Sequence, residues 1–404
     1  MRTLLIDGNY FANRCLALLN GADKQNNLQS DEECDLFHKA LISELIKLWQ
    51  PFSKYFDNFV IVADYKSWRK NVTFIPWYIS KEELESGEAH VGYKETRDIR
   101  KKESPINYNN FIKVWYNFLK EYQDKINIIY IDGLEGDDVL KLITDKLNEE
   151  DVETLIYASD KDLIQLVHGN IFLFLNIKSK QHPDGCFVLS KDLYEKYISG
   201  GNDIIKKIMI SYQDDIDFLD LLKINLYDDR AQSERKLNQG MLIAEPYKII
   251  FTKAVCGDKS DNILPIMRWK SKTGNVNYSV TEKIVDTALG DMLEHYNDRG
   301  CKSTMENSDK MIDFFNNVII ETKQRTPIHN LKVAFDHNLK MVHLDPKYYP
   351  KESVQTFEEI YPSIELNLKK RIFPDDLNKI FGVSTTQIND KATDILKDSL
   401  PDDF

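Results

Sequence analysis

The sequence predicts an α/β protein in which a central, mostly parallel sheet is flanked by helices and is followed by a helical region. Short apolar runs at residues 4–6, 60–63 and 155–158 are typical of buried parallel strands. Segments with apolar residues at helical spacing separate these runs, as crossovers between parallel strands require. After about residue 190 the pattern turns helical.

The first half of the chain supplies most of the predicted sheet. Residues 1–65 are expected to form a strand, two helices and a second strand. Segment 66–105 has no clear periodicity and is interrupted by prolines and glycines. It is too long for an ordinary loop, which indicates a functional excursion. Alternation then returns in this order: a helix at 111–122, a strand at 128–131, a helix after Asp137, a strand ending at 158, a short helix from 161, and strands at 171–176 and 186–189.

The second half is expected to be mainly helical. A helix is predicted at 245–256, and residues 306–404 should be helical except for a short extended piece at 332–335. We therefore expect three parts: a core at 1–190, a helical region at 191–345 with an insertion at about 200–245, and a helical C-terminal segment with an acidic tail at 346–404. The sequence does not indicate what the insertion does.

Acidic residues stand where the predicted strands end or helices begin. In an open α/β sheet the carboxyl ends of the strands form the usual ligand site, so we expect these side chains to meet. Carboxylates packed together repel one another unless cations share the space. Oxygen ligands without a Cys/His set of zinc spacing favour Mg²⁺ or Mn²⁺. The predicted metal ligands are Asp7, Asp64, Glu135, Asp137, Asp138, Asp160, Asp162, Asp258 and Asp261.

Helix capping is the alternative reading of each acid taken singly. The run Gly-Leu-Glu-Gly-Asp-Asp at 133–138 weakens it, because capping explains one acid at a helix start and not three.

These motifs, in this order and rough spacing, resemble the structure-specific 5′ nucleases over about residues 1–290. That family includes the flap endonucleases, the 5′-nuclease domain of bacterial DNA polymerase I and phage 5′ exonucleases. The helical tail after the last motif is similar to that of the ribonucleases H of T-even phages. The matching pieces are Ile-Asp-Gly-Asn at 6–9, Ala-Asp at 63–64, Tyr-Lys-Glu-Thr-Arg at 93–97, Glu-Gly-Asp-Asp at 135–138, Ser-Asp-Lys-Asp-Leu at 159–163 and Gly-Asp-Lys-Ser-Asp-Asn-Ile at 257–263.

The resemblance implies a PIN-like nuclease core, an arch or clamp at 66–105 and a helix-turn-helix DNA-binding region after the core. It implies two Mg²⁺ ions, replaceable by Mn²⁺, that activate water and stabilise the leaving 3′ oxygen. The first five predicted ligands would gather about one ion and the last four about the other. Lys94 and Arg97 would reach the scissile phosphate and stabilise charge in the transition state.

Further basic residues are expected to contact DNA. Lys94, Arg97 and Lys101 have helical spacing, although a solvated charged face is the alternative reading. The glycine-rich run that follows the last motif in relatives is replaced here by residues 264–270, which suggests direct phosphate contacts. The expected DNA-binding residues are Tyr93, Arg100, Lys101, Lys102, Arg268, Lys270 and Lys272.

Composition limits the setting in which the chain works. The formal net charge of -12 is unusual for a nucleic-acid enzyme, but the cations concentrate at 66–102 and 268–272. No apolar stretch is long enough to span a membrane, and the start of the chain reads as a strand. Five scattered cysteines fit a reduced, cytoplasmic protein. A phage origin, and hence the host cytoplasm, is a guess from the lysine- and asparagine-rich composition.

The predicted function is a Mg²⁺-dependent 5′-3′ nuclease, acting as exonuclease or flap endonuclease in DNA replication or repair. Ribonuclease H activity on RNA·DNA primers is a further expectation. The expected partners are 5′-flap, nicked or forked DNA and RNA·DNA hybrids, and the chain should be a monomer. The acidic tail at 399–404 could dock on a replication protein, although a frayed terminus is the commoner case. The alternatives are a catalytically silent DNA-binding scaffold of the same fold and a PIN-type ribonuclease.

Overall fold

The structure is a computed structural model, and it describes residues 1–20, 26–176, 186–190, 193, 241–244, 246–270, 277–282, 285 and 328–382. The chain forms two compact units, each assembled from segments that are distant in sequence. The first unit consists of Met1–Lys66, Ser104–Ala244 and Tyr349–Phe404, and the second of Ser67–Glu103 and Glu245–Tyr348.

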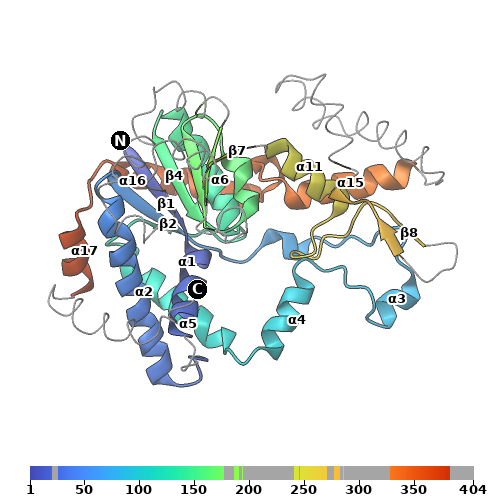
Figure 1. Cartoon of the computed structure of the whole chain (residues 1–404), viewed down its shortest axis with the longest axis horizontal. Coiled ribbons are helices and arrows are strands. Elements are labelled where there is room, and N and C mark those ends of the chain that lie inside the picture. The colour runs from blue at the N-terminus through green and yellow to red at the C-terminus, as the bar shows by residue number, and fades with distance from the viewer. Residues whose placement is uncertain are drawn as a thin grey trace, which may run out of the picture. The chain divides into compact units, whose positions relative to one another are not determined.

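The first unit contains the sheet and most of the long helices (Figure 1). Its elements are β1 (Arg2–Asp7), α1 (Gly8–Leu19), α2 (Asp31–Phe52), β2 (Asn58–Val62), α5 (Tyr108–Tyr122), β3 (Ile128–Ile129), α6 (Gly136–Glu149), β4 (Glu153–Ala158), the 3₁₀ helix η2 (Lys161–Leu166), β5 (Ile171–Leu175), β6 (Cys186–Leu189), β7 (Met241–Ile243), α16 (Lys351–Leu368) and α17 (Pro374–Phe381).

The sheet is mostly parallel, as predicted. Its strand order is β3-β2-β1-β4-β5-β6-β7, and all neighbours are parallel except the antiparallel pair β5–β6. The strands predicted near residues 128–131, 171–176 and 186–189 are confirmed as β3, β5 and β6. Strand β7 is a correction, because it lies inside the stretch that was expected to be a helical insertion; the rest of that insertion lies outside the described residues.

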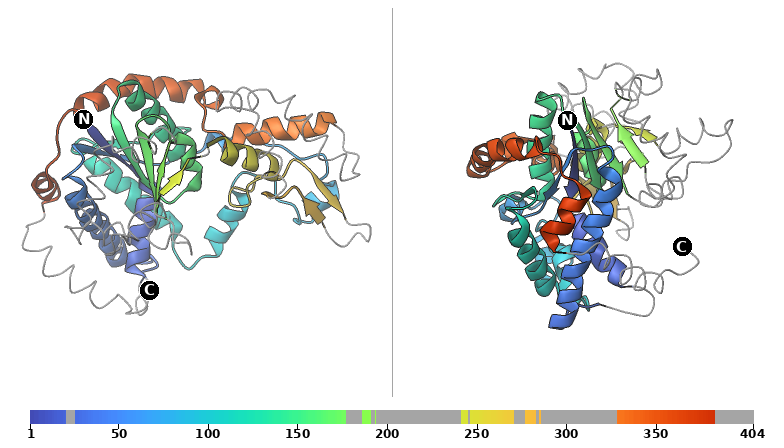
Figure 2. Two further views of the ribbon diagram at one scale, coloured as in Figure 1. Left: turned by 45° about the horizontal axis from the view of Figure 1, so that its top comes forward. Right: turned by 90° about the vertical axis from the view of Figure 1, so that its left-hand side faces the viewer.

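Helices cover both faces of the sheet (Figure 2). Successive strand residues point to opposite faces, and Leu4 and Ile6 belong to a large aromatic-rich core together with residues of α1, α2, α5 and α17. Helix α6 packs against β1, β2 and β4, and its buried residues are not part of that core. Both faces of the central strands are therefore buried, which explains why β2 is apolar at almost every position.

The C-terminal helices pack onto the first unit. Trp49 Nε1 donates to Ile372 O at 3.1 Å, and Ser353 Oγ donates to Asp132 O at 2.6 Å. The predicted helical C-terminal segment is thus present through α17, and the acidic tail at 399–404 lies outside the described residues. Among the helices described, none has both the length and the apolar character needed to cross a bilayer.

The second unit joins the excursion at 66–105 to the region after residue 245. Apolar residues of α11 and α15 form its core together with Tyr93, and Arg69 Nε donates to Met341 O at 2.8 Å. The core boundary predicted at 190 missed this arrangement, because such long-range contacts leave no local periodicity. The elements are η1 (Trp68–Asn71), α3 (Lys81–Glu85), α4 (Glu95–Glu103), α11 (Pro246–Cys256), β8 (Arg268–Lys270), β9 (Asn277–Ser279), α15 (Ile328–Val342) and η3 (Pro346–Tyr348).

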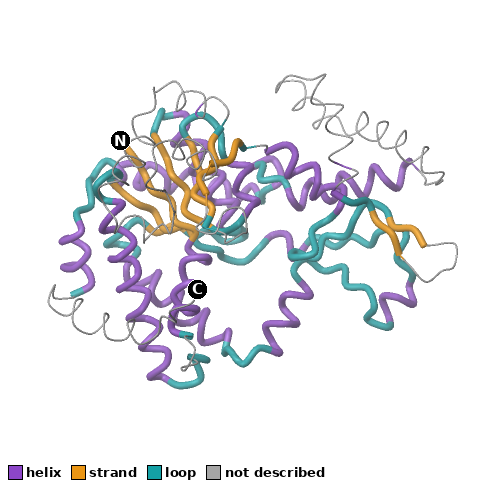
Figure 3. Tube along the Cα trace, in the orientation of Figure 1, coloured by secondary structure: helices purple, strands orange, loops and turns teal. Residues whose placement is uncertain are grey.

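One local expectation in this unit was wrong and another is only partly covered. Helix α11 is followed by a turn and then by the antiparallel hairpin β8–β9 (Figure 3). Most of the stretch after this hairpin, where the second helix of the expected helix-turn-helix could follow, lies outside the described residues. Trp269 and Tyr278 are residue types that favour strands. The extended piece expected at 332–335 is part of helix α15, whose apolar residues pack against α11.

Candidate active site

Three acidic residues of the first unit stand at the carboxyl ends of adjacent strands. Asp7 is the last residue of β1, Asp64 follows β2, and Asp160 follows β4. Strand β1 lies between β2 and β4 and is parallel to both. The chain continues from β1 to β2 on one side and returns to β4 on the other, so this edge is the point where the strand order reverses and open α/β sheets bind ligands.

The negative charges of Asp64 and Asp160 act on the carboxyl group of Asp7. Burial raises the pKa of Asp7, the backbone N–H of Tyr10 lowers it, and the negative charges of Asp64 and Asp160 raise it, so that it lies at about 7. That N–H donates to Asp7 Oδ1 at 3.0 Å, so Asp7 also caps α1. The positive end of the helix dipole there offsets part of the repulsion.

Gly8 lets α1 start directly beside the sheet. A Cβ atom at this position would lie 2.8 Å from Val62 O and 3.0 Å from the Trp115 ring. A side chain at Gly8 would therefore displace the Asp7 backbone.

Asp64 is held from two directions within the first unit. Its Oδ1 accepts a hydrogen bond from Gly136 N at 2.5 Å, and its backbone carbonyl accepts one from the hydroxyl of Tyr116 on α5. Burial and the nearby Asp64 charge raise the pKa of Tyr116 to about 12, so this hydroxyl keeps its proton. Sequence reasoning missed Tyr116, whose apolar helical pattern indicated only packing.

The acids at the start of α6 have different surroundings. Glu135 occupies the N-cap position and is 8% exposed. Asp138 is fully buried, and its Oδ2 accepts a hydrogen bond from Glu135 N at 3.2 Å. Asp137 is half-buried in the first turn. The contact of Asp138 is a helix cap, so capping and metal binding compete for this residue.

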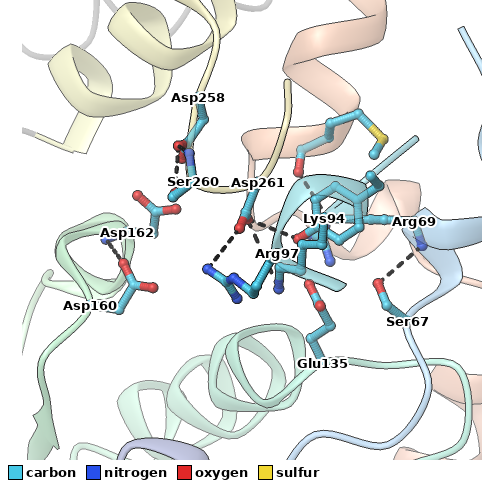
Figure 4. A network of polar contacts seen from close by, with 12 residues as sticks. Ser67, Arg69, Lys94, Arg97, Glu135, Asp160, Asp162, Asp258, Ser260 and Asp261 are labelled. Atoms are coloured by element: carbon cyan, nitrogen blue, oxygen red, sulfur yellow. Dashed lines mark hydrogen bonds and ion pairs between the residues drawn. The ribbon is translucent and has the colours of Figure 1, made fainter. Parts of the chain in front are cut away.

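Asp160 and Asp162 lie at the start of η2 (Figure 4). Asp160 Oδ1 accepts from Asp162 N at 2.9 Å, which makes Asp160 the N-cap of η2. Asp160 is exposed and Asp162 is half-buried. The exposed carboxylate keeps lone pairs available for a ligand.

The oxygen donors at this edge fit a hard divalent cation. Mg²⁺ and Mn²⁺ prefer carboxylate ligands, and a cation would relieve the repulsion that Asp7 experiences. Within the described ranges, no three acidic, histidine or cysteine side chains are grouped closely enough to form a complete metal site by themselves. Local N–H donors hold Asp7, Asp64 and Asp160 in place, which separates like charges.

Replacing Asp7 with asparagine is expected to stabilise the metal-free protein. The raised pKa means that the folded wild-type chain loses stability as pH rises from about 4 to about 7. Asparagine still caps α1 but carries no charge. In EDTA at pH 8 we expect the free energy of unfolding to rise by about 1–3 kcal/mol, below the roughly 4 kcal/mol of the full shift.

Denaturant unfolding at pH 4 and pH 8 measures this effect. The advantage of Asp7→Asn should nearly vanish at pH 4, where the wild-type carboxyl is protonated in the folded state and about half protonated in the unfolded state. A variant that is less stable than wild type at pH 8 without metal would contradict it.

In the second unit, neighbouring side chains and one backbone N–H stabilise the negative charge of Asp258. Its Oδ2 pairs with Lys253 Nζ at 2.5 Å, and its Oδ1 accepts from Ser260 N at 2.8 Å and Ser260 Oγ at 2.6 Å (Figure 4). Although burial works against it, these contacts hold the pKa of Asp258 below its usual range.

Asp261 contacts three side chains of the segment 93–97. Arg97 Nη2 lies 3.2 Å from its Oδ1, and Lys94 Nζ lies 4.0 Å from its Oδ2. Tyr93 OH donates to the same Oδ2 at 3.0 Å. Tyr93 is 7% exposed, so its expected contact with DNA is corrected: a ring buried in the unit's core supports Asp261 from inside.

Helix α4 carries the remaining cations of this region. Arg100, Lys101 and Lys102 are exposed in its last turn. Although the side chain of Lys101 is largely exposed, partial desolvation lowers its pKa, Asp98 raises it, and the charges of Arg97, Lys70 and Lys94 lower it. Three of the cations of α4 are thus grouped in its last turn, whereas Glu95 and Asp98 lie in its first turn.

The last group of predicted DNA contacts is only partly described. Arg268 Nη1 lies 3.7 Å from Glu83 Oε1. Lys270 ends β8, with its side chain outside the described part, and Lys272 lies outside the described residues.

The N-terminal part of the chain, slightly less than half of its length, is similar to known proteins. Residues 2–197 match the family model "5'-3' exonuclease, N-terminal resolvase-like domain". The chain is 33% identical over 72 residues to a 5'-3' exonuclease of Buchnera aphidicola, covering 18% of this chain and 23% of the relative. It is 32% identical over 81 residues to the thermostable DNA polymerase I of Thermus thermophilus, covering 20% of this chain and 9% of the relative. The matches thus span less than a quarter of either relative.

Two solved structures from bacteriophage T5 are also similar. One is a 5'-exonuclease with bound zinc, at 15% identity and TM-score 0.46, covering 99% of this chain and 100% of that one. The other is a flap endonuclease in complex with DNA and metal ions, at 14% identity and TM-score 0.42, covering 94% and 99%.

Proposed function

We propose that this chain is a divalent-metal-dependent 5′-3′ nuclease, because residues 2–197 match the model of the 5'-3' exonuclease N-terminal, resolvase-like domain. Its substrates are 5′-flap, nicked or forked DNA and RNA·DNA hybrids, which fits primer or flap removal in DNA replication. The observation that carries this proposal is the shared electrostatic environment of Asp7, Asp64 and Asp160 at the carboxyl edge of the sheet.

The proposed cofactor is a pair of Mg²⁺ ions, for which Mn²⁺ can substitute. When bound, the ions would act as Lewis acids that activate water and stabilise the leaving oxygen. The chain's own part is to hold the carboxylates in place, through Tyr10 N–H on Asp7 and Gly136 N–H on Asp64. Glu135, Asp137 and Asp162 complete the first unit's candidates, whereas the cap made by Asp138 favours a structural role.

The second unit is proposed to supply the positive charge. Lys94 and Arg97 would stabilise charge that develops on the scissile phosphate. The cations of α4, together with Arg268, Lys270 and Lys272, would bind the nucleic-acid backbone. Asp258 and Asp261 remain candidate ligands of the second ion, and each would have to exchange its present partner for the metal.

Cleavage of 5′-labelled substrates tests the proposal. A DNA flap and an RNA·DNA hybrid are incubated with the full chain in Mg²⁺, in Mn²⁺ and in EDTA, and product lengths are measured. We expect short 5′ products with either cation and none in EDTA. If the chain binds the flap but does not cleave it in either cation, the nuclease assignment is wrong and the DNA-binding scaffold is favoured.

A further inference from the structure

Asn262 joins two separate segments of the second unit. Its side-chain amide donates to His90 O at 3.0 Å and to Gly92 O at 2.8 Å. It therefore ties the turn after α11 to the chain just before α4. Asn262 is half-buried, so these two hydrogen bonds are partly shielded from water.

The backbone of the same turn makes a second attachment. Lys94 N donates to Asp261 O at 2.9 Å, directly beside Asn262. The turn itself is closed by Asp258 and Ile263, which exchange two backbone hydrogen bonds of 2.8 Å. Asn262 has φ +60° within this turn, a conformation that asparagine tolerates better than most residues.

This double attachment fixes the entry into α4. Lys94 has φ +57°, and its carbonyl accepts the helical hydrogen bond from Asp98 N at 3.0 Å. With the backbone set in this way, the side chains of Lys94 and Arg97 both reach Asp261 (Figure 4). A shift of residues 90–94 would move both cations together.

We propose that Asn262 is a positioning residue, whose amide holds the backbone of residues 90–94 so that Lys94 and Arg97 keep their placement. This inference rests on the proposed function, in which the two cations stabilise phosphate charge. The position requires two N–H donors and a backbone that accepts positive φ. Aspartate satisfies only the backbone condition, because it would place acceptors against two carbonyl oxygens, and glycine has no donors.

Asn262 could instead serve only to close its own turn, and two variants distinguish this role from positioning. Asn262→Gly keeps the left-handed backbone and removes the amide, so a residue needed only for the turn would tolerate it. Asn262→Asp keeps the shape of the side chain and replaces its donors. Asn110→Ala is the matched control, since Asn110 Nδ2 likewise donates to a backbone carbonyl, Leu28 O at 2.7 Å, but in the first unit.

Single-turnover cleavage of a 5′ flap by the full chain tests the proposal. We expect Asn262→Gly to reduce the cleavage rate about tenfold or more, with KM changed by no more than about twofold, because misplacement of a catalytic group by about 1 Å can cost 10²-fold. Asn262→Asp should be slower still, and Asn110→Ala should match wild type.

A mutant cycle shows whether Asn262 acts through Lys94 and Arg97. In a background that carries both Lys94→Met and Arg97→Met, Asn262→Gly should change the rate by less than about twofold, because both cations that it positions are already absent. An unchanged rate for Asn262→Gly, or an equal loss in both backgrounds, would overturn the proposal.

Amide hydrogen exchange gives a readout that does not depend on cleavage. Exchange at the Lys94 amide should become faster in Asn262→Gly and stay at the wild-type rate in Asn110→Ala. If the wild-type chain cleaves nothing, the proposed function fails, and unchanged exchange at Lys94 would separately reject the positioning role.

Discussion

Asp160→Ala should lose cleavage by roughly a thousandfold while still binding DNA, because removal of an inner electrostatic group of a preorganised site has this magnitude. Asp160 is exposed and caps only the short helix η2, so the fold should survive its loss. Backbone binding by the cations of α4 does not use this carboxylate. Cleavage rates and flap binding are measured on the same protein preparation in Mg²⁺.

Two variants separate charge from capping in this experiment. Asp160→Asn keeps a capping oxygen and removes the charge, so it should be nearly as inactive as the alanine variant. Asp57→Ala is the matched control at the amino edge of the sheet, where Asp57 Oδ2 accepts from Arg2 N at 3.0 Å. Undiminished Mg²⁺-dependent cleavage by Asp160→Ala would contradict the assignment of this edge as the active site.

Lys94→Met should lower the single-turnover rate by about a hundredfold, because one preorganised cation that meets developing charge contributes roughly this much. Methionine keeps most of the length of the side chain, which is 15% exposed and lies with Nζ 4.9 Å from the Tyr93 ring centre. The fold and the affinity for DNA should therefore change little. Single-turnover rates at saturating flap substrate measure the effect.

Two other lysines provide the comparison for Lys94. Lys369→Met removes an exposed charge at the C-cap of α16 and should leave the rate unchanged. Lys102→Met should weaken binding and lower the salt dependence of binding by about one phosphate contact, with the saturated rate retained. A Lys94→Met variant with the wild-type rate at saturation would remove Lys94 from the catalytic set.

The sheet and its acidic edge could be predicted because both depend on local signals. Apolar runs bounded by acids identified β1, β2 and β4 together with Asp7, Asp64 and Asp160. The spacing of Lys94, Arg97 and Lys101 was compatible with a helix, and α4 begins one residue after Lys94. In each case the deciding information lies within a few residues of the element.

The interleaving of the two units could not be predicted because it depends on contacts between distant segments. Tyr78 OH donates to Pro265 O at 2.5 Å, and Asn262 reaches His90 and Gly92, so segment 67–103 belongs with 245–348. Nothing in the local pattern of either segment specifies the other. The hairpin β8–β9 was missed because three-residue strands are too short to show a period.

The different surroundings of the acidic residues could not be predicted from the sequence either. Asp138 and Asp160 both follow an apolar run, yet the first is buried as a cap and the second is exposed. Asp261 and Asn262 are adjacent, but the asparagine makes the contacts that hold the backbone before α4. The residue types indicated a polar site, and only the packing around each side chain assigned its contacts.

Equilibrium binding of Mn²⁺ tests the central claim, that the carboxyl edge of the sheet holds divalent cations, most directly. Free Mn²⁺ is followed by electron paramagnetic resonance during titration of the full wild-type chain, of Asp64→Asn and of the control Asp57→Asn. Asparagine at position 64 keeps an acceptor for Gly136 N, so the variant removes charge alone. We predict that Asp64→Asn weakens binding about tenfold or more while Asp57→Asn binds as wild type; equal Mn²⁺ binding by all three proteins would contradict the account.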